Sequence, residues 1–297
     1  MEKIKIHFLG TGNAIPTKKR NHSAILLIYK HENVLIDCGE GTQRQFKMAD
    51  LSPSKLTKLL ITHWHGDHIL GLPGLFQTLR MSEYSRALEV YGPKKTKEYL
   101  NSLEKLFNIK INLDVKEVNN KFFETKEFYL ESAEMSHGTP CLAYSFVIKD
   151  RLRLDKKKLA KYKLPNSPLI SKLQNGENVK FNNKTIKAKD VTYLEKGRKI
   201  TIILDTLPNN NAVKLATNSH NIICESTFSK EEEKTAKEYL HLTSEQAAHI
   251  AKKSNSKKLI LTHISQRYEH NPNKILSEAK KVFRNTFLVN DFDVIEI

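Results

Sequence analysis

The chain up to Thr62 consists of short apolar or alternating runs separated by glycine and polar turns. Runs of this kind, rich in Ile, Leu and Val, are typical of β-strands. We expect strands at Ile4 to Leu9, Ala24 to Tyr29, Asn33 to Asp37 and Lys58 to Thr62. This arrangement indicates the edge of a layered, β-rich protein.

Helical spacing follows these strands, and strand and helix then alternate to the end of the chain. Apolar residues recur with helical periodicity over Ile69 to Met81, and a second helix is expected after the Gly92-Pro93 turn, at Thr96 to Phe107. The later expected elements are strands near Val115 and at Phe128 to Leu130, Leu142 to Ile148, Lys199 to Asp205, Asn221 to Glu225 and Lys258 to Thr262, helices at Thr243 to Lys253 and near Asn273 to Phe283, and a final strand.

A basic segment between residues 150 and 192 interrupts this alternation. It contains enough Leu, Ile, Tyr and Phe to form local structure, so we do not expect it to be disordered. A layered enzyme of 297 residues can still be built around one core. We therefore expect a single domain over residues 1–297, with residues 150–192 as an insertion.

The charge is strongly positive and unevenly distributed. The formal net charge is +16 and the pI is near 9.5. Between Asp150 and Asp190 there are 12 Lys or Arg against 4 Asp or Glu, which is half of the total excess. Lys and Arg supply most of the sequence-independent affinity of proteins for nucleic acids. A lysine-rich solvated surface is the plainer alternative, but this clustering favours a polyanionic partner.

The longest apolar runs are far too short to span a bilayer. The N-terminus begins with an alternating segment where a signal peptide would need an apolar stretch. We therefore expect a cytoplasmic protein.

Three cysteines, Cys38, Cys141 and Cys224, are odd in number, widely spaced and set in apolar surroundings. We expect them to be buried thiols, not disulfides or metal ligands.

Four potential metal ligands, His63, His65, Asp67 and His68, follow the apolar strand Leu59 to Ile61 directly. A strand that ends at a helix can hold such a cluster rigidly, and imidazole and carboxylate together suit Zn²⁺ or a similar borderline ion. A lone histidine is more often a surface or core residue. Packing gives no reason for three histidines and an aspartate within six residues, so the run predicts a metal site.

Further candidate ligands stand at or near the ends of other expected strands. His137 lies in Met135-Ser136-His137-Gly138, Asp205 closes one apolar strand, and His263 closes another. Each taken singly is unremarkable. Their recurrence in the same local setting as His63 favours a larger site, such as a pair of ions that share a bridging oxygen.

The His-x-His-x-Asp-His run at residues 63 to 68, with these later ligands, resembles the metallo-β-lactamase superfamily over essentially the whole chain. The resemblance implies an α+β fold, a four-layer αβ/βα sandwich, with two metal ions at one rim. His63, His65 and His137 would hold the first ion, Asp67, His68 and His263 the second, and Asp205 would bridge them. It does not fix the substrate, since the scaffold hosts several hydrolytic reactions.

Two blocks narrow the resemblance to the ribonuclease Z family. Residues 16 to 21 match the family's Pro-x-Lys-x-Arg-Asn loop, and Ile36 to Gln45 match its next block. Two departures are visible. The insertion reads Leu164-Pro165-Asn166-Ser167-Pro168 where the family arm has a Gly-x-Pro element, and Leu204 precedes Asp205 where glycine is common.

The resemblance implies cleavage of precursor tRNA at its 3′ side by two-metal phosphodiester hydrolysis. Asp67 would handle the proton of the attacking water, and His241, oriented by Glu225, would protonate the leaving oxygen. Read from the residues alone, His241 is a surface histidine near a helix start, and Thr243 or Ser244 is an N-cap. The implied cofactors are two Zn²⁺ ions per subunit, with Mn²⁺ possible, and the implied assembly is a homodimer.

The insertion occupies the place of the family's flexible arm, an exosite that grips tRNA away from the metals, with a long solvated loop as the alternative. We expect RNA contacts from Lys18, Lys19, Arg20, Asn21, Lys156, Lys157, Lys158, Lys161 and Lys163. Two other classes stay open. A metallo-hydrolase of small esters, thioesters or lactones would not need the basic insertion, and a noncatalytic RNA-binding relative should have lost ligands.

Overall fold

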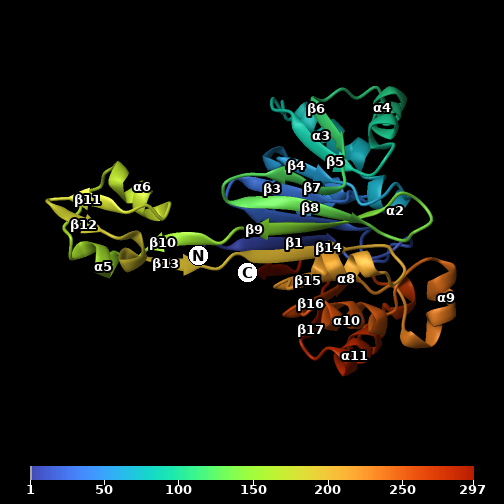
Figure 1. The fold of residues 1–297 in the computed structure, drawn as a ribbon. Helices are drawn as coiled ribbons and strands as arrows, with labels where there is room; N and C mark the ends of the chain where they lie inside the picture. Colours follow the sequence, from blue (N-terminus) through green and yellow to red (C-terminus); the bar gives the residue numbers. More distant parts are fainter. Residues whose placement is uncertain (1) are drawn as a thin grey trace.

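Two seven-stranded sheets packed face to face form the body of the protein in the computed structural model, which describes residues 2–297 (Figure 1). The first sheet has the order β18-β1-β2-β3-β4-β5-β6 and the second the order β17-β16-β15-β14-β9-β8-β7. The strands of the first sheet are β1 (Ile4–Gly10), β2 (Ala24–Tyr29), β3 (Glu32–Ile36), β4 (Lys58–Leu60), β5 (Leu88–Gly92), β6 (Leu113–Glu117) and β18 (Val294–Glu296). Those of the second are β7 (Asn120–Glu124), β8 (Phe128–Glu134), β9 (Leu142–Ile148), β14 (Arg198–Ile203), β15 (Asn221–Glu225), β16 (Lys258–Thr262) and β17 (Thr286–Leu288).

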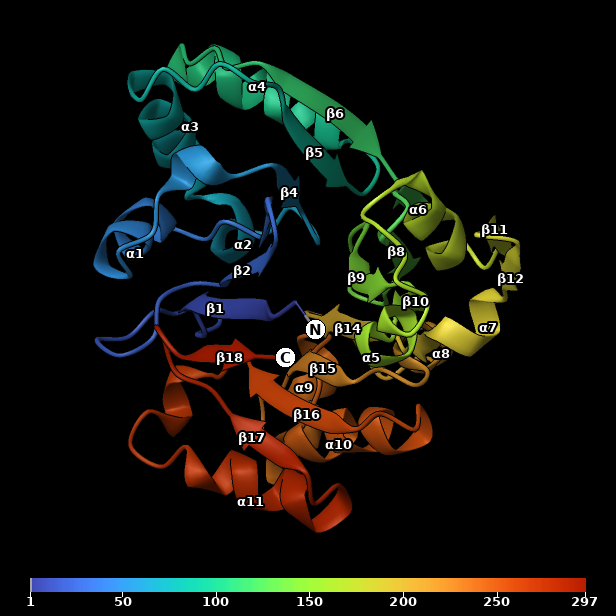
Figure 2. The ribbon, with the colours of Figure 1, turned by 90° about the vertical axis from the view of Figure 1, so that its left-hand side faces the viewer.

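Helices cover the outer face of each sheet (Figure 2). The first sheet is covered by α1 (Thr42–Met48), α3 (Leu72–Met81) and α4 (Thr96–Phe107), and the second by α8 (Asn210–Ala216), α10 (Ser244–Lys253) and α11 (Asn273–Val282). The short helices α2 (Gly66–Ile69) and α9 (Glu233–Glu238) and the 3-10 turns η1 (Pro53–Lys55), η2 (Lys230–Glu232) and η3 (Gln266–Tyr268) complete the body. This is the four-layer αβ/βα sandwich expected from the sequence, and that prediction is confirmed.

The period of the strands explains the layers. Successive side chains of a strand point to opposite faces of the sheet. In β2, Ile25 and Leu27 enter the core between the two sheets, whereas Ala24 and Leu26 enter the core under α1 and α3. A strand buried on both faces therefore reads as a continuous apolar run. Across the inner core, the Tyr144 hydroxyl donates to the carbonyl of Ile61 at 2.7 Å, which ties the sheets together near the metal-ligand candidates.

The helix expected over Ile69 to Met81 is divided in two. Helix α2 ends at Ile69 and α3 begins at Leu72, with Pro73 in its first turn. Gly71 lies between them and donates its backbone N–H to the carbonyl of Cys38. A Cβ atom there would lie 2.1 Å from the carbonyl oxygen of Gly39, so only glycine allows this contact. The division lets α2 turn its histidine toward the end of the sheets while α3 covers the outer face.

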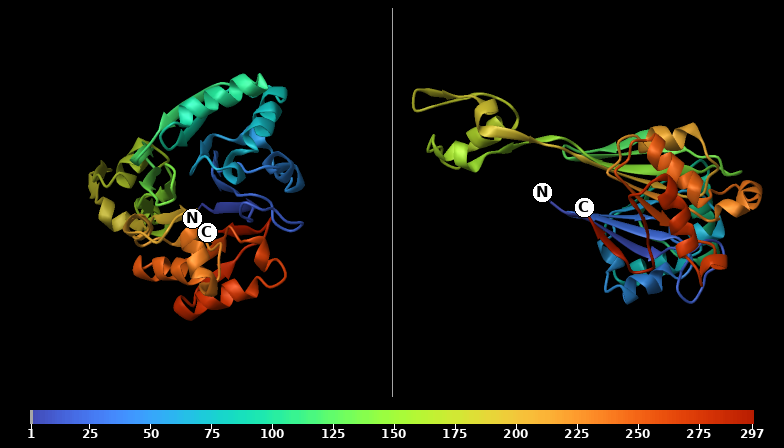
Figure 3. Two further views of the ribbon diagram at one scale, coloured as in Figure 1. Left: turned by 90° about the vertical axis from the view of Figure 1, so that its right-hand side faces the viewer. Right: turned by 90° about the horizontal axis from the view of Figure 1, so that it is seen from below.

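An arm, residues 151–195, extends from the body as an antiparallel ribbon of β10 (Arg151–Leu154) and β13 (Thr192–Glu195) (Figures 1 and 3). Its tip holds α5 (Lys156–Ala160), α6 (Pro168–Gln174), β11 (Val179–Phe181), β12 (Lys184–Ile186) and α7 (Ala188–Val191). Five buried residues form a small core of its own: Leu173, Val179, Ile186, Ala188 and Val191. The tip is thus a folded unit on a two-stranded stalk.

The arm and the His137 and Asp205 loops lie at opposite ends of the same two strands. Strand β9 begins just after the loop that carries His137 and ends at Ile148, beside the stalk. Strand β14 begins beside the stalk at Arg198 and leads to Asp205. Seven extended residues span about 23 Å, so the length of the sheet separates the two features. No helix within residues 2–297 has the length and apolar character needed to cross a membrane.

Candidate metal centre

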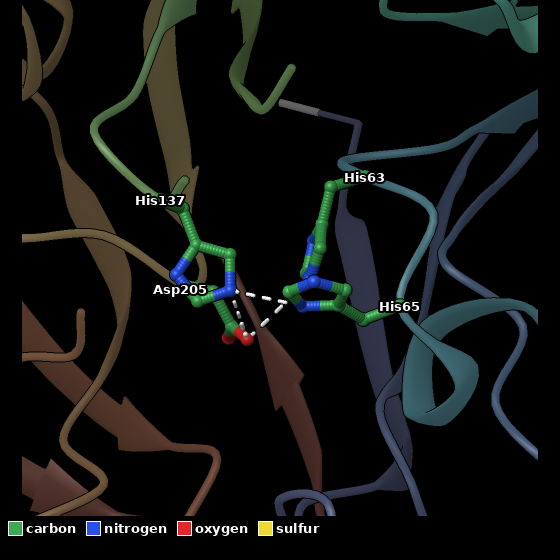
Figure 4. A group of neighbouring side chains, drawn as sticks. All are labelled: His63, His65, His137 and Asp205. Atoms are coloured by element: carbon green, nitrogen blue, oxygen red, sulfur yellow. Dashed lines mark hydrogen bonds and ion pairs between the residues drawn. The ribbon is translucent and has the colours of Figure 1, made fainter. Parts of the chain in front are cut away.

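Seven side chains from separate parts of the chain meet at one end of the sandwich. His63 and His65 follow β4, Asp67 and His68 lie in α2, His137 follows β8, Asp205 follows β14, and His263 follows β16. Their donor atoms form two groups that share Asp205, each with all donor atoms within 4.8 Å of one another. The groups are His63, His65, His137 and Asp205 (Figure 4), and Asp67, His68, Asp205 and His263. The structure thus brings together every candidate ligand named from the sequence.

Asp205 lies at the centre of this arrangement. Its Oδ2 atom is 3.5 Å from His63 Nε2, 3.4 Å from His137 Nε2 and 3.3 Å from His68 Nε2. Its Oδ1 atom is 3.2 Å from His263 Nε2. The carboxylate is 2% exposed. One buried carboxylate therefore faces both groups, which is the geometry that a bridging ligand needs.

Four of the imidazoles are fixed through their other ring nitrogen, the one turned away from Asp205. His68 Nδ1 lies 2.6 Å from Asp37 Oδ2, and His137 Nδ1 lies 2.9 Å from the carbonyl of Leu240. Carboxylates and carbonyls only accept hydrogen bonds, so each Nδ1 carries a proton, and Nε2 is the nitrogen that can present a lone pair to a cation. Hydroxyl groups hold the other two: Thr62 Oγ1 lies 3.1 Å from His63 Nδ1, and Thr227 Oγ1 lies 2.9 Å from His263 Nδ1. Outer partners of this kind are typical of metal-binding histidines.

The lone pairs that result fit a cation. His68 Nε2 and His263 Nε2 are 3.3 Å apart. Two unprotonated nitrogens at this distance repel each other unless a positive charge lies against them. His137 Nε2 also lies close to a ring nitrogen of another candidate ligand, at 3.1 Å from His65 Nδ1. Among the described residues, the buried atoms His63 Nε2 and Asp205 Oδ1 have no hydrogen-bond partner. Unpaired buried polar atoms are costly, and a metal ion would satisfy these. The donor set and the geometry of the two clusters fit a metal-binding site.

A histidine and a glutamate stand beside the second group. Glu225, at the end of β15, places Oε1 at 3.1 Å from His241 Nδ1, and His241 Nε2 lies 3.9 Å from Asp205 Oδ2. Burial by itself lowers the pKa of His241, but the carboxylates of Glu225 and Asp205 outweigh it and raise this pKa to about 9. Thr206 N donates to Glu225 Oε1 and fixes its carboxylate. His241 is thus oriented with its free nitrogen toward the metal-ligand cluster.

The predicted N-cap role of Thr243 is also confirmed. Its hydroxyl accepts from Gln246 N, and the Gln246 side chain accepts from Thr243 N, which is a capping box at the start of α10. Ser244 instead donates its hydroxyl to Glu278. Neither residue reaches the metal-ligand cluster through a hydrogen bond within residues 2–297.

The basic loop, residues 12–21, divides into exposed and inward-facing cations. Lys18 and Lys19 are exposed and form no ion pair within the described part of the chain. Arg20 is different: its side chain is 4% exposed and its guanidinium is bonded inside the protein. This burial does not favour the RNA contact expected of Arg20, which stays a prediction. Asn21 is half-buried and donates its side-chain amide to the carbonyl of Glu40 at 2.7 Å.

The five arm lysines that were expected to contact RNA are all exposed. These residues, exposed on or just after α5, are Lys156, Lys157, Lys158, Lys161 and Lys163. Asp155 caps α5 by accepting from the backbone N–H groups of Lys157 and Lys158. At the stalk, Arg151 and Arg153 both pair with Glu195 and are thereby held to the ribbon. The free positive charge is therefore concentrated at the tip of the arm.

Several residues that orient the site were not foreseen. Asp37 is fully buried, and its two oxygens accept from His68 Nδ1, Thr62 N and Thr62 Oγ1. Thr227 links His263 to Glu225 through its hydroxyl. The sequence could have indicated Asp37 as a site residue, since it follows an apolar strand just as Asp205 does. It could not have indicated Thr227, because a threonine after a strand is common.

Two further expectations have clear outcomes. Cys38, Cys141 and Cys224 are all free and buried, and burial raises the pKa of each thiol, so the prediction of buried thiols is confirmed. Leu204 is buried, and its backbone is not among the positive-φ positions, so the residue before Asp205 does not need to be glycine. Backbone strain falls instead at Asp37 and His263, with φ of 56° and 58°.

Comparison with solved structures defines the fold class of the protein. A metallo-β-lactamase fold protein of Bacillus subtilis, YhfI, superposes with a TM-score of 0.73 over 100% of both chains at 17% identity. The short form of human tRNase Z superposes with a TM-score of 0.70 over 98% of both chains at 26% identity. With its layer order and clustered donors, this chain is a metallo-β-lactamase fold protein.

Sequence relatives identify the family within this fold class. The chain is 40% identical to ribonuclease Z of Nanoarchaeum equitans, over 89% of this chain and 84% of the relative. It is also 40% identical to a ribonuclease Z of Bacillus cereus, over 96% of both. The chain belongs to the ribonuclease Z family. Residues 4–159 also match a family profile described as "Anti-Pycsar protein Apyc1". That match ends before Asp205, Glu225, His241 and His263, whereas the ribonuclease Z relatives cover nearly the full length.

Proposed function

We propose that this protein is an endoribonuclease that cleaves precursor tRNA at its 3′ side and leaves a tRNA 3′-hydroxyl and a trailer with a 5′-phosphate. The observation that carries the proposal is the position of Asp205. It faces two groups of metal-ligand side chains, and the oriented imidazole of His241 lies 3.9 Å away. Membership of the ribonuclease Z family and the exposed cations of the basic loop and the arm support RNA as the substrate.

The two groups of donor atoms support the following ligand assignment. His63, His65 and His137 would hold one ion, Asp67, His68 and His263 the other, and Asp205 both. Nitrogen and carboxylate donors suit two Zn²⁺ ions, and Mn²⁺ accepts the same set. Bound there, the two cations would lower the pKa of a water molecule and offset the charge of the scissile phosphate.

The protein's own groups would move the protons. Asp67 is slightly exposed, and its Oδ2 lies 3.4 Å from both His68 Nε2 and His263 Nε2, at the open side of the site. It would orient the attacking water and accept its proton. On the other side, His241 Nε2 would donate a proton to the ribose 3′-oxygen as the phosphorus–oxygen bond breaks. Glu225 holds the imidazole in the orientation and charge state that this step needs.

A hollow beside the site gives room for part of the substrate. It has a volume of about 550 Å³ and is lined by residues on both sides of His137 and by the ends of β5 and β6, among them Pro93, Lys94, Asn119, Met135 and Thr139. Its mixed polar and apolar lining suits a nucleotide. The relatives named ribonuclease Z make the small-molecule hydrolase the less favoured function.

We also propose that the protein is a homodimer in which the arm of one subunit binds the tRNA that occupies the partner's active site. The support is geometric: the arm leaves the sheet at the end opposite the metal-ligand cluster. Its exposed lysines therefore lie beyond the opposite end of the sheet from the cluster of their own subunit. Because precursor tRNA is an intracellular substrate, we propose a cytoplasmic location.

The experiment is cleavage of a radiolabelled precursor tRNA, with and without a chelator, and mapping of the cut. We expect a single cut on the 3′ side that the chelator abolishes and Zn²⁺ or Mn²⁺ restores. Parallel assays use a chromogenic phosphodiester, a thioester and a lactone. Rapid lactone or thioester hydrolysis without RNA cleavage would contradict the proposal and favour the alternative.

Complementation tests the arm in the dimer. A variant that lacks residues 152–188 is mixed with the His241→Ala variant, and mixed dimers are formed by dissociation and reassociation. One active site of the mixed dimer has both an intact His241 and the partner's arm, so activity on precursor tRNA should return. If each arm served its own subunit, the mixture would stay inactive. Sedimentation analysis of each preparation provides the oligomeric state.

A further inference from the structure

The connection between β17 and β18 places one carboxylate, Asp291, against the base of the basic loop. Asp291 Oδ1 accepts from the backbone N–H of Thr11 at 2.9 Å and from its hydroxyl at 2.6 Å. Asp291 Oδ2 accepts from the backbone N–H of Asn21 at 2.7 Å and from Gln45 Nε2 at 3.1 Å. Thr11 directly precedes the basic loop, and Asn21 is its last residue. A single side chain from the end of the chain therefore holds both sides of a loop near its beginning.

The buried guanidinium of Arg20 completes the same network. Its Nη1 donates to Thr11 Oγ1 at 2.6 Å and to the carbonyl of Val289 at 2.7 Å, and its Nη2 donates to Asn290 Oδ1 at 2.8 Å. The Thr11 hydroxyl thus accepts from Arg20 and donates to Asp291. Arg20 stands next to Lys19 in the chain, so this anchoring fixes the direction in which the two exposed lysines leave the surface.

The network also reaches the metal-ligand cluster. The carbonyl of Thr11 accepts from the backbone N–H of Ile264 at 2.9 Å, and Ile264 directly follows His263. Gly12 and Ile264 form an isolated parallel bridge at this point. Gly12 N donates to the carbonyl of Asn21 at 2.8 Å and closes the loop. Thr11 is therefore fixed on one side by Asp291 and on the other by the backbone beside a metal-ligand candidate.

We propose that Asp291 is a positioning residue for substrate binding: it sets Lys18 and Lys19 at a fixed place relative to the metal-ligand cluster. This inference rests on the proposed ribonuclease function, because it assumes that those lysines meet RNA phosphates. Asp291 does not touch the substrate and acts through Thr11 and Asn21. Charged hydrogen bonds shared by one carboxylate hold a loop more firmly than neutral ones do.

A purely structural role for Asp291 makes different predictions. If it only stabilised the junction of β1 and β18, its loss would lower the melting temperature but leave the KM for RNA unchanged in the molecules that remain folded. If it positions the loop, its loss should raise KM, change kcat less, and make the loop lysines less important. Coupling between Asp291 and the lysines is therefore the decisive measurement.

The experiment compares the wild type, Asp291→Asn, the double variant Lys18→Ala/Lys19→Ala, and the triple variant that combines them. Asparagine keeps the size of the side chain but has one acceptor oxygen, so it cannot accept both from Thr11 and from Asn21 and Gln45. Asp293→Asn is the matched control, since this exposed carboxylate two residues later accepts only from Asn290 N within the described chain. Steady-state cleavage of precursor tRNA, its binding at several salt concentrations, and thermal melting are measured for each.

We expect Asp291→Asn to raise KM for precursor tRNA about tenfold or more, the loss typical of hydrogen bonds to a charged group. In that background the lysine substitutions should cost much less than they do in the wild type. Strict additivity, or a loss confined to melting temperature, would overturn the proposal. If Asp291→Asn does not fold, Thr11→Val replaces it, because valine removes only the hydroxyl that joins Arg20 to Asp291.

Failure of the proposed function would look different. A wild-type protein that does not cleave precursor tRNA contradicts the ribonuclease assignment. The binding measurements would then still decide the positioning role, since the coupling between Asp291 and the two lysines can be read from affinity for tRNA without any cleavage.

Discussion

Glu225 Oε1 lies 3.1 Å from His241 Nδ1, and this contact turns His241 Nε2 toward Asp205. The carboxylate is itself held by the backbone N–H of Thr206 and the hydroxyl of Thr227. The pair is therefore rigid. It resembles other sites in which a buried acid fixes both the tautomer and the orientation of a histidine that transfers protons.

Replacement of His241 by alanine should lower kcat for precursor tRNA by about 10²- to 10⁴-fold, the range of general-acid contributions. Glu225→Gln should have a smaller effect, because the imidazole stays but loses its charged partner. Metal content, measured by atomic absorption, should not change in either variant. Wild-type turnover of His241→Ala at saturating RNA would show that another group protonates the leaving oxygen.

Titration of His241 should show the influence of Glu225 directly. In the chelated protein we expect the imidazole resonance to titrate near pH 9, above the ordinary pKa, because the carboxylates of Glu225 and Asp205 outweigh burial. A pKa raised on folding stabilises the protein fully below the unfolded value of about 6.5 and stops doing so as the pH rises through 9. The contribution of this pair to the free energy of unfolding should therefore disappear between those values. NMR titration of His241, with Glu225→Gln as the control, would reveal the raised pKa.

Asp37 should control metal affinity although it is not a ligand candidate. Its Oδ2 lies 2.6 Å from His68 Nδ1 and accepts from the hydroxyl of Thr62 at 2.7 Å. Asp37→Asn should weaken metal binding by about 10- to 100-fold, as the removal of such outer partners does elsewhere. Competition with a chromogenic chelator measures this. Asp50→Asn, at an exposed carboxylate, is the control, and equal affinities in the two variants would refute the role.

The arm lysines should contribute affinity without chemistry. Replacing Lys156, Lys157 and Lys158 by alanine should lower tRNA affinity and reduce the slope of log K against log salt by about 0.7 to 0.9 for each phosphate that is no longer neutralised. The kcat at saturation should stay close to wild type. An equal number of exposed lysines on the body, Lys252, Lys253 and Lys257, provides the matched control. An unchanged salt slope in the arm variant would mean that the tip does not meet the RNA backbone.

The sequence predicted the layers and the ligand candidates well for a physical reason. Each candidate ligand follows an apolar strand or opens a helix directly after one, and buried strands leave a long apolar run that is easily read. The break between α2 and α3 was missed because it depends on Gly71 meeting the backbone of Gly39, a contact between segments far apart in sequence.

The inward turn of Arg20 was missed for a similar reason. A basic residue in a polar loop reads as solvated, and only its partners Val289 and Asn290, at the other end of the chain, reveal its burial. The outer partners of the histidines are equally hidden, since Thr62 and Thr227 have no sequence feature that sets them apart. Local patterns therefore predict which residues reach the site, whereas the side chains that orient them depend on tertiary contacts.

Strand β18 pairs with β1, so two segments that are far apart in sequence lie side by side in the first sheet. The basic loop near β1 is held by Val289, Asn290 and Asp291, which lie just before β18. The loop can therefore take its final position only after this later segment has joined the sheet. Folding of the inner core alone would leave Lys18 and Lys19 without a fixed direction, so docking of β18 would be the step that completes the substrate-binding surface.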